Sequence, residues 1–280
     1  MMKHSVFFLL ATTTAAIAFT ACGHNDGRLS GNDLAADSVM ADTNNVDFEE
    51  EPYVEPSRHI DVLFEDFLYT FLTDAKFQAH RIAYPLPRTH NGWKEMVAKG
   101  QWTYTPLYAN DDSYVLMFDQ TNADVSAQDS TSKHVTLEWC DFDAQTSRQF
   151  VFDKMDGKWL LTGLVCDSLN HRSDNGFYTF FHRFATDSLF RQQHISNPFA
   201  FKTIDTDSYQ AIDGVLDAEQ WPDFAPDIPA GHLTHIAYGR RHPASHTRTI
   251  VITGADTGAS CALRFRYQRG KWTLYSMEDV

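Results

Sequence analysis

The densest group of potential metal ligands is a set of four histidines in the C-terminal part of the chain, His232, His235, His242 and His246. Imidazole is a common metal ligand, and ligands three or four residues apart share one face of a helix. His232 and His235, however, begin a predicted strand, where residues three apart point to opposite faces. His242 and His246 flank Pro243 in a predicted loop. We therefore expect solvated histidines, with no metal and no other cofactor.

Two aspartates, Asp74 and Asp187, recur at equivalent places, each after a threonine at the end of a predicted helix. A carboxylate enclosed in a cavity can act as a general acid or base. At the start of a helix, the same side chain accepts hydrogen bonds from the free amides of the first turn. We predict that both aspartates cap the helices that follow them, so neither is assigned a catalytic role.

Other catalytic patterns are missing from the sequence. No Gly-x-Ser-x-Gly motif is present for a nucleophilic serine. The glycine-bearing segment 254–258 joins two predicted strands and opens no helix, which excludes a phosphate-binding loop there. We therefore predict no catalytic residue and a protein that is not an enzyme.

Two tryptophans, Trp159 and Trp272, are the candidates for ligand binding. Each follows a predicted tight hairpin turn, at Asp156-Gly157 and at Arg269-Gly270, where glycine accepts the positive φ that such turns require. An indole in this position can form the wall of a pocket, or it can belong to the core or its rim. The sequence favours the core and leaves the pocket wall as an alternative.

The first 21 residues have the pattern of a secretion signal. One positive charge, on Lys3, precedes a stretch of apolar and small residues over positions 5–20. This stretch is shorter than the ~20 apolar residues that a membrane-spanning helix needs. We predict that residues 1–21 are a signal peptide and are removed on export.

The segment Phe19-Thr20-Ala21-Cys22-Gly23 resembles the bacterial lipobox, although Phe19 replaces the usual aliphatic residue. The resemblance implies that Cys22 receives diacylglycerol and becomes the new N-terminus, so that acyl chains anchor the protein to a membrane. Gly23 is not the aspartate that retains such lipoproteins at the inner membrane. The expected location is therefore the cell envelope, at the outer membrane, on either face.

An acidic segment follows the lipidation site. Residues 23–58 hold nine acidic and two basic side chains, in a chain with a formal net charge of −14. The segment shows no sustained apolar periodicity, which is typical of a disordered linker. We predict a tether over residues 22–54. The acidity also excludes a nucleic-acid partner, which requires clustered Lys and Arg.

Three cysteines remain once Cys22 is assigned to lipidation, namely Cys140, Cys166 and Cys261. An odd number permits at most one internal disulfide. Cys140 and Cys166 lie on predicted strands that are not neighbours, which makes a bridge between them too long. We expect free, buried cysteines.

An internal repeat with a spacing of 113 residues covers the remainder of the chain. The matched residues are mostly aromatic and occur in the same order in both copies. They pair Phe64, Phe67, Phe71, Asp74, Phe77, Ile82, Pro85, Phe152, Gly157, Lys158 and Trp159 with Phe177, Phe180, Phe184, Asp187, Phe190, Ile195, Pro198, Phe265, Gly270, Lys271 and Trp272. In the middle, Gln101-Trp102 matches Gln220-Trp221 at a spacing of 119. The repeat predicts two diverged domains, over residues 55–167 and 168–280.

Each copy begins with an amphipathic helix, because aromatic residues recur every three or four positions from Phe64 and from Phe177. A second short helix follows the capping aspartate, and residues 93–99 suggest a third helix in the first copy. Four strands come next in each copy. They are expected over 114–119, 135–140, 150–154 and 158–165, and over 233–238, 248–253, 262–267 and 271–277. We predict an antiparallel meander with its helices on one face.

This order of elements resembles the nuclear transport factor two-like fold, in which helices close a curved sheet into a cone. The lipobox, the acidic tether and the paired Phe-rich helix with its Gly-Lys-Trp hairpin also resemble a family of Gram-negative lipoproteins with a domain of unknown function. The resemblance implies an α+β protein of two tandem cystatin-like domains, each with N-terminal helices packed on a curved antiparallel sheet. It implies a fold and no particular activity.

Three functional hypotheses remain open. The leading one is an exported, lipid-anchored envelope protein whose cones bind a small apolar ligand or a protein partner. The second is an enzyme with a hydrolase- or isomerase-like site inside one cone. The third is a purely structural scaffold of the envelope, with filled cones and an apolar patch shared with another chain.

Overall fold

The computed structural model describes residues 53–54, 58–106, 113–119, 131–205, 208, 210–239, 245–254 and 259–279. The predicted signal peptide, Cys22, nearly all of the predicted tether and His242 lie outside the described residues. None of the helices within these ranges is long and apolar enough to cross a membrane.

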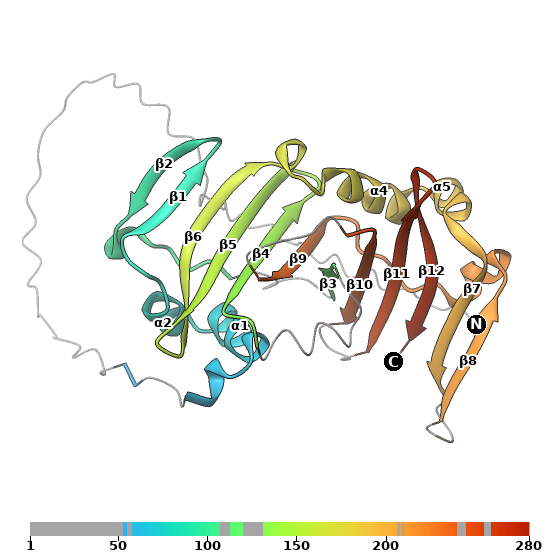
Figure 1. The fold of residues 1–280 in the computed structure, drawn as a ribbon, viewed down its shortest axis with the longest axis horizontal. Helices are drawn as coiled ribbons and strands as arrows, with labels where there is room; N and C mark the ends of the chain where they lie inside the picture. The colour runs from blue at the N-terminus through green and yellow to red at the C-terminus, as the bar shows by residue number, and fades with distance from the viewer. Residues whose placement is uncertain are drawn as a thin grey trace, which may run out of the picture. The chain divides into compact units, whose positions relative to one another are not determined.

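The described chain contains short helices and twelve strands. The helices are α1 (Phe64–Thr73), α2 (Ala75–His80), α4 (Asn175–Thr186), α5 (Ser188–Gln193) and α6 (Trp221–Phe224), with 3-10 turns η1 (Arg58–Asp61), η2 (Lys99–Gln101), η3 (Leu169–His171) and η4 (Ala218–Gln220). The strands are β1 (Leu86–His90), β2 (Trp93–Val97), β3 (Ser113–Phe118), β4 (His134–Asp141), β5 (Thr146–Met155), β6 (Lys158–Ser168), β7 (Ile195–Ile204), β8 (Ala211–Leu216), β9 (His232–Tyr238), β10 (Thr247–Gly254), β11 (Ser260–Gln268) and β12 (Lys271–Asp279). The strands form one mixed sheet in the order β2-β1-β6-β5-β4-β9-β3-β10-β11-β12-β7-β8 (Figure 1). The fold is therefore α+β with one large sheet.

The same order of elements occurs twice along the described chain. In the first half (residues 58–167), α1 and α2 precede β1 to β6, and in the second half (residues 168–279), α4 and α5 precede β7 to β12. The Phe-rich helices predicted from the sequence are α1 and α4. Asp74 Oδ1 accepts a hydrogen bond from the Phe77 amide at 2.9 Å, and Asp187 Oδ1 accepts one from the Phe190 amide at 2.9 Å. The predicted capping role of both aspartates is confirmed.

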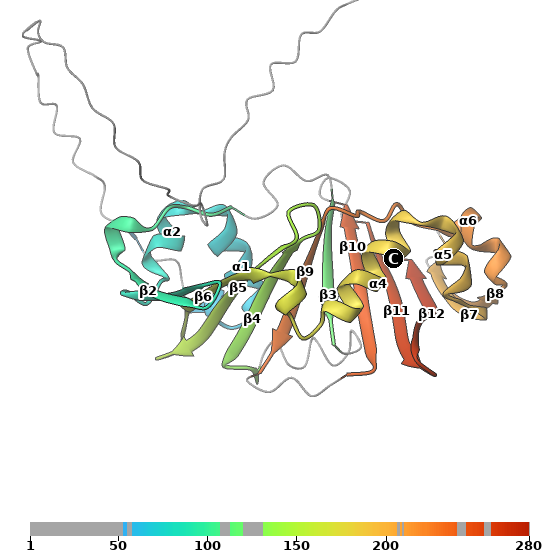
Figure 2. The ribbon, with the colours of Figure 1, turned by 90° about the horizontal axis from the view of Figure 1, so that it is seen from above.

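The strand pairing differs from the predicted meanders, because β3 and β9 are exchanged between the halves. Strand β3 pairs with β10 of the second half, β9 pairs with β4 of the first half, and β3 and β9 lie side by side in parallel (Figure 2). Thr136 lies opposite Ala237, and Thr249 lies opposite Phe118. These two pairs are equivalent at the repeat spacings of 113 and 119 residues. The prediction of two separate four-stranded antiparallel meanders is therefore wrong at β3 and β9.

The two hydrophobic cores lie on opposite faces of the sheet. Leu137 of β4 and its opposite neighbour Ile236 of β9 belong to the core under α1, whereas Cys140 and its opposite neighbour Leu233 belong to the core under α4. The central strands therefore have a core on each side, and all five residues from Leu233 to Ala237 are buried. Strands that are buried on both faces carry apolar side chains on both. Such a pattern identifies a strand but does not specify which neighbour it pairs with.

The predicted helix over residues 93–99 is also wrong, since residues 93–97 form β2. The turn before it is Asn91-Gly92, with φ of 47° and 86°, and it joins β1 to β2 as a hairpin. Asn-Gly is the strongest short hairpin signal, because both residues must adopt positive φ in this turn. The predicted hairpin turns at Asp156-Gly157 and Arg269-Gly270 are confirmed, with φ of 50° and 82° in the first and 53° and 81° in the second.

Candidate functional site

A cavity of about 690 Å³ lies in the second half, between the start of α4 and strands β10 to β12. Its described lining combines aromatic, basic and acidic side chains with small residues. These are Asp119, Ser173, Asp174, Gly176, Phe177, Phe180, His194, Ser245, His246, Arg248, Tyr267, Gly270, Lys271 and Trp272. Ligand sites in proteins have volumes of about 300–1,000 Å³ and place a few polar groups among apolar walls. The cavity has the size and composition of such a site.

The apolar wall of the cavity comes from α4 and β12. Phe177 and Phe180 lie one turn apart on α4, and the ring of Trp272 meets that of Phe177 edge-on at 4.8 Å between centroids. Edge-to-face contacts of this kind hold aromatic rings in fixed positions. The cavity therefore has a preformed aromatic surface.

The cavity exists in the second half because small residues stand where the first half has large ones. At the repeat spacing of 113 residues, Ser173 corresponds to Ile60, Gly176 to Leu63 and His194 to Arg81. A Cβ atom added at Gly176 would meet nothing within 4 Å. The start of α4 thus leaves space that the start of α1 fills with side chains.

The first half closes the equivalent place with a buried ion pair. Arg81 donates to both carboxylate oxygens of Asp61, at 2.7 and 3.1 Å, and both side chains are less than 5 % exposed. Asp61 also accepts from the backbone amide of Trp159 at 2.9 Å, and the guanidinium of Arg81 lies 4.7 Å from the ring centroid of Phe77. The guanidinium of Arg81 therefore lies over aromatic rings of the first core, where it fills the place that is equivalent to the cavity.

Asp174, the counterpart of Asp61 in the second half, is paired instead with a residue of the sheet. Arg248 of β10 donates to Asp174 Oδ1 at 2.5 Å, and its Nε lies 3.4 Å from Asp119 Oδ1. Its other terminal nitrogen donates to the carbonyl oxygens of Ser245 and Thr247, at 3.0 and 2.8 Å. Arg248 is buried, so these contacts hold one charged wall of the cavity in place.

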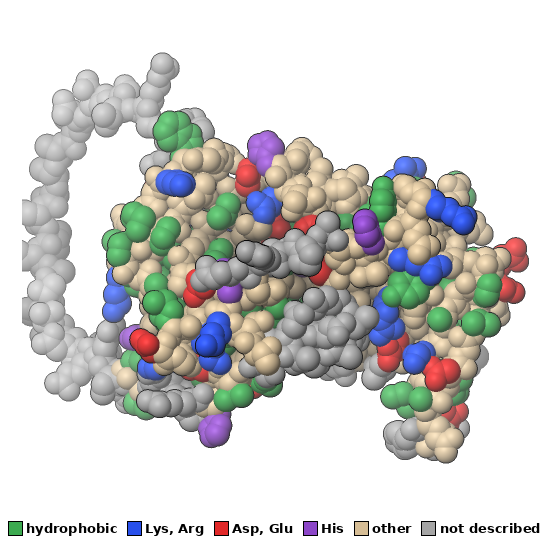
Figure 3. Space-filling view, in the orientation of Figure 1, with side chains coloured by type: hydrophobic (Ala, Val, Ile, Leu, Met, Phe, Trp, Pro, Cys, Tyr) green, Lys and Arg blue, Asp and Glu red, His purple; other side chains and the backbone are tan. Residues whose placement is uncertain are grey.

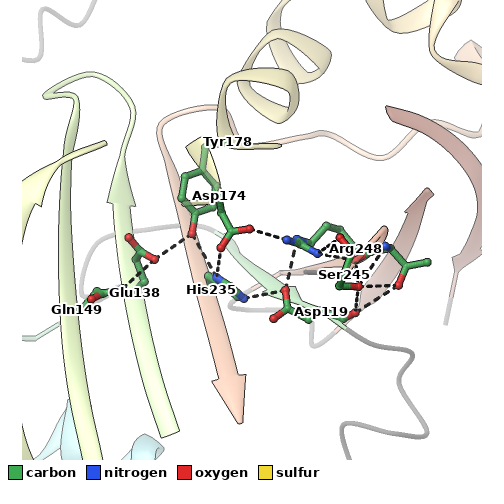
Figure 4. Close-up of polar contacts among 9 residues, drawn as sticks. Asp119, Glu138, Gln149, Asp174, Tyr178, His235, Ser245 and Arg248 are labelled. Carbon is green, nitrogen blue, oxygen red and sulfur yellow. Dashed lines mark hydrogen bonds and ion pairs between the residues drawn. The ribbon is translucent and has the colours of Figure 1, made fainter. Parts of the chain in front are cut away.

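A polar cluster extends from this wall into the interior and joins the two halves (Figure 4). Asp119, which directly follows β3, lies 3.1 Å from His235 Nε2 on β9. His235 Nδ1 lies 3.2 Å from the hydroxyl of Tyr178 on α4, which donates to Glu138 of β4 at 3.0 Å. Glu138 also accepts from Arg172 at 2.6 Å. The cluster thus depends on the exchanged strands, because β3 and β9 bring Asp119 and His235 together.

Burial and the neighbouring Glu138 raise the pKa of the Tyr178 hydroxyl well above its usual value. The phenol therefore keeps its proton at neutral pH and acts as a donor to the carboxylate. The interior end of the cluster is a fixed hydrogen-bonded support for the cavity wall.

A family model described as a domain of unknown function, DUF4348, matches residues 40–279. The chain belongs to this family. The DUF4348 chain is also similar to a solved structure, the crystal structure of an NTF2-like protein from Bacteroides fragilis at 2.15 Å resolution. The two share 28 % sequence identity with a TM-score of 0.69, and the match covers 81 % of this chain and 99 % of the other. Among curated proteins, none matches this chain. The predicted likeness to the nuclear transport factor two-like fold is thus supported, while the family description assigns no activity.

The structure separates the two tryptophans that the sequence treated alike. Trp272 lines the cavity, whereas Trp159 is fully buried in the first core of the DUF4348 chain. The difference follows from Arg81 and its neighbours, which fill the first half.

The predicted histidine group is dispersed in the described part of the chain. His232 contacts Trp139 with 4.9 Å between ring centroids and the rings tilted by 38°, whereas His235 points to the opposite face, into the polar cluster. His246 lines the cavity beside Tyr267. No group of three or more potential ligands among the described residues could hold a metal ion.

The sequence did not single out Asp119, Asp174, His194 or Arg248 as site residues. Two of them stand where the copies differ, since His194 and Arg248 replace Arg81 and Val135. A comparison of the copies for such differences finds these two, but it does not find Asp174, which matches Asp61. Asp119 has no such signal, because it comes from the exchanged strand.

Two of the three remaining cysteines are free and buried, as expected, namely Cys140 and Cys261. Burial raises the pKa of the Cys261 thiol to about 12, so this side chain packs as a small apolar group. Cys166 is buried as well, which agrees with that part of the prediction.

Proposed function

We propose that this protein is an exported, lipid-anchored protein of the outer membrane that binds a small, largely apolar molecule in the cavity of its second half. The observation that supports binding most strongly is the cavity of about 690 Å³, lined by Phe177, Phe180 and Trp272 and closed in the first half by larger side chains. The anchor is supported by the lipobox-like segment at Cys22.

We further propose that the two halves are diverged copies of one NTF2-like unit that arose by duplication. The repeated order of elements and the equivalent pairs Thr136–Ala237 and Thr249–Phe118 support this history. In this proposal, one copy became a closed structural unit and the other kept a binding cavity.

Filling the cavity tests the proposed binding. The double variant Ser173→Ile and Gly176→Leu carries the residues that the first half has at these places, and it is expected to weaken binding of the uncharged apolar probe N-phenyl-1-naphthylamine at least tenfold. Its free energy of unfolding should not fall, because leucine is a better helix former than glycine by roughly 1 kcal/mol. Probe fluorescence and urea unfolding give the two values.

Gly176→Ala is the matched control, since its added Cβ meets open space and leaves most of the cavity volume. It should bind the probe like the unmodified chain. Unchanged binding by the filled double variant would contradict the assignment of this cavity.

The anchor has its own test. Replacing Cys22 by serine removes the acceptor of the diacylglycerol, and the protein is then expected in the soluble fraction instead of the membrane fraction. Fractionation of expressing cells followed by immunoblotting measures this. A variant that stays with the membranes would refute anchoring through Cys22.

An enzymatic role is supported less well by the same geometry. Asp119 is the carboxylate of the cavity best placed to act as a general base, with His235 behind it at 3.1 Å. It also contacts the guanidinium of Arg248 at 3.4 Å, an ion pair that a proton-accepting step would have to break. The pair therefore fits a fixed wall better than a proton-transferring group.

A scaffold role would use other surfaces. Hydrophobic side chains are exposed at both ends of the sheet, among them Trp93 on β2 and Val215 on β8 (Figure 3). An edge strand with apolar side chains can pair with another chain. Such contacts would be compatible with the cavity and would not replace it.

A further inference from the structure

The acidic side chains that line the cavity have basic partners within the chain, whereas most of the basic side chains have no acidic partner among the described residues. Both carboxylates, Asp119 and Asp174, contact the guanidinium of Arg248, at 3.4 and 2.5 Å. Asp119 also contacts His235. A cationic ligand would therefore have to compete with Arg248 for either carboxylate.

The basic groups of the lining other than Arg248, in contrast, have no acidic partner among the described residues. Lys271 Nζ contacts the carbonyl oxygen of Gln193 at 3.5 Å. His194 donates Nδ1–H to the Phe190 carbonyl oxygen at 2.8 Å, so Nε2 of the neutral ring is an acceptor and donates only when the ring is protonated. His246 lies against the ring of Tyr267. Lys and Arg side chains (blue) also gather over β11 and β12, with one His side chain (purple) nearby (Figure 3).

These side chains give the cavity an apolar wall and, at Lys271, hydrogen-bond donors that are not used up. The ammonium group of lysine has three donors and no acceptor, and an imidazole has two donors only when it is protonated. A ligand that matches both parts has an apolar body and an anionic end.

We infer that the ligand of this cavity is an amphiphilic anion, such as a carboxylate with an aliphatic body. Its head group binds Lys271, with His194 and His246 beside it, and its body lies against Phe177 and Trp272. This inference rests on the proposed binding function and adds the chemical class of the ligand.

A series of ten-carbon probes with different head groups tests the inference. The full chain from residue 22, carrying Cys22→Ser so that no detergent is needed, is titrated with decanoate, 1-decanol and decylamine in a calorimeter. We expect decanoate to bind at least fivefold more tightly than decanol, and decylamine to bind most weakly. Lys271→Met should reduce decanoate binding about fivefold, as expected for a partly exposed ion pair, and leave decanol binding unchanged.

Lys158→Met is the matched control, because Lys158 occupies the same position in the Gly-Lys-Trp hairpin of the first half, where the Arg81–Asp61 ion pair fills the equivalent place. It should leave the binding of all three probes unchanged. Equal binding of decanoate and decanol, or equal weakening of both by Lys271→Met, would overturn the anionic ligand and leave the proposed binding function intact. Failure of all three probes to bind would overturn both.

Discussion

Replacing Asp61 by alanine is expected to lower the free energy of unfolding by about 3–5 kcal/mol, because it removes the carboxylate that accepts from two nitrogens of the buried Arg81 guanidinium. Arg81 is 2 % exposed, and the backbone amide of Trp159 loses its acceptor in the same variant. The urea dependence of the circular dichroism signal measures the loss.

The equivalent change in the second half, Asp174→Ala, is the matched comparison. Arg248 keeps Asp119 and two backbone carbonyl oxygens as partners, so a loss of only about 1–2 kcal/mol is expected. Equal losses in the two variants would contradict the view that one half is a closed structural unit and the other a binding site.

Separating the halves is expected to abolish the folded monomer. A chain of residues 55–167 lacks β9 and β10. Strand β4 then keeps only one of its two neighbours, β5, and β3 loses both of its neighbours, β9 and β10. The faces of these strands that carry Met117 and Cys140 lose the core under α4 and would be exposed to water. Light scattering should find the isolated half dimeric, aggregated or unfolded.

Mixing the half of residues 55–167 with the half of residues 168–280 restores every strand pair of the sheet. We therefore expect a 1:1 complex with the near-ultraviolet circular dichroism of the intact chain. A first half that is monomeric and unfolds cooperatively by itself would show that the halves are independent domains.

The elements that local physical chemistry determines were predictable from the sequence. The aromatic stripe from Phe64 requires a helix packed on a sheet, and the carboxylates of Asp74 and Asp187 find amides three residues ahead. Asp156-Gly157 can adopt the positive φ values of a tight hairpin. In each case the interacting groups are close together in the sequence.

What depends on distant partners was not predictable. Strand β9 is buried on both faces, with Leu233 on one and Ile236 on the other, and this pattern is the same whether β9 pairs with β10 or with β4. The location of the cavity likewise follows from residues far apart, since Asp119 comes from one half and Arg248 from the other. The hairpin at Asn91-Gly92 is different, because its signal is local and present in the sequence.

The exchange of β3 and β9 is the feature on which the site depends, since it brings Asp119 to the cavity of the other half. Disulfide mapping tests it directly with two double variants of the full chain. In the structure, Thr136 lies opposite Ala237, a distance of ~5.5 Å between Cα atoms in a hydrogen-bonded antiparallel pair, which suits a disulfide.

Phe118 lies two strands away from Thr136, at roughly 10 Å, which is too far for a disulfide. After mild oxidation and proteolysis, mass spectrometry should find the cross-link in the variant Thr136→Cys with Ala237→Cys and not in Thr136→Cys with Phe118→Cys. A cross-link in the second variant and none in the first would mean that β3 pairs with β4 of its own half. The placement of Asp119 in the cavity of the second half would then be wrong.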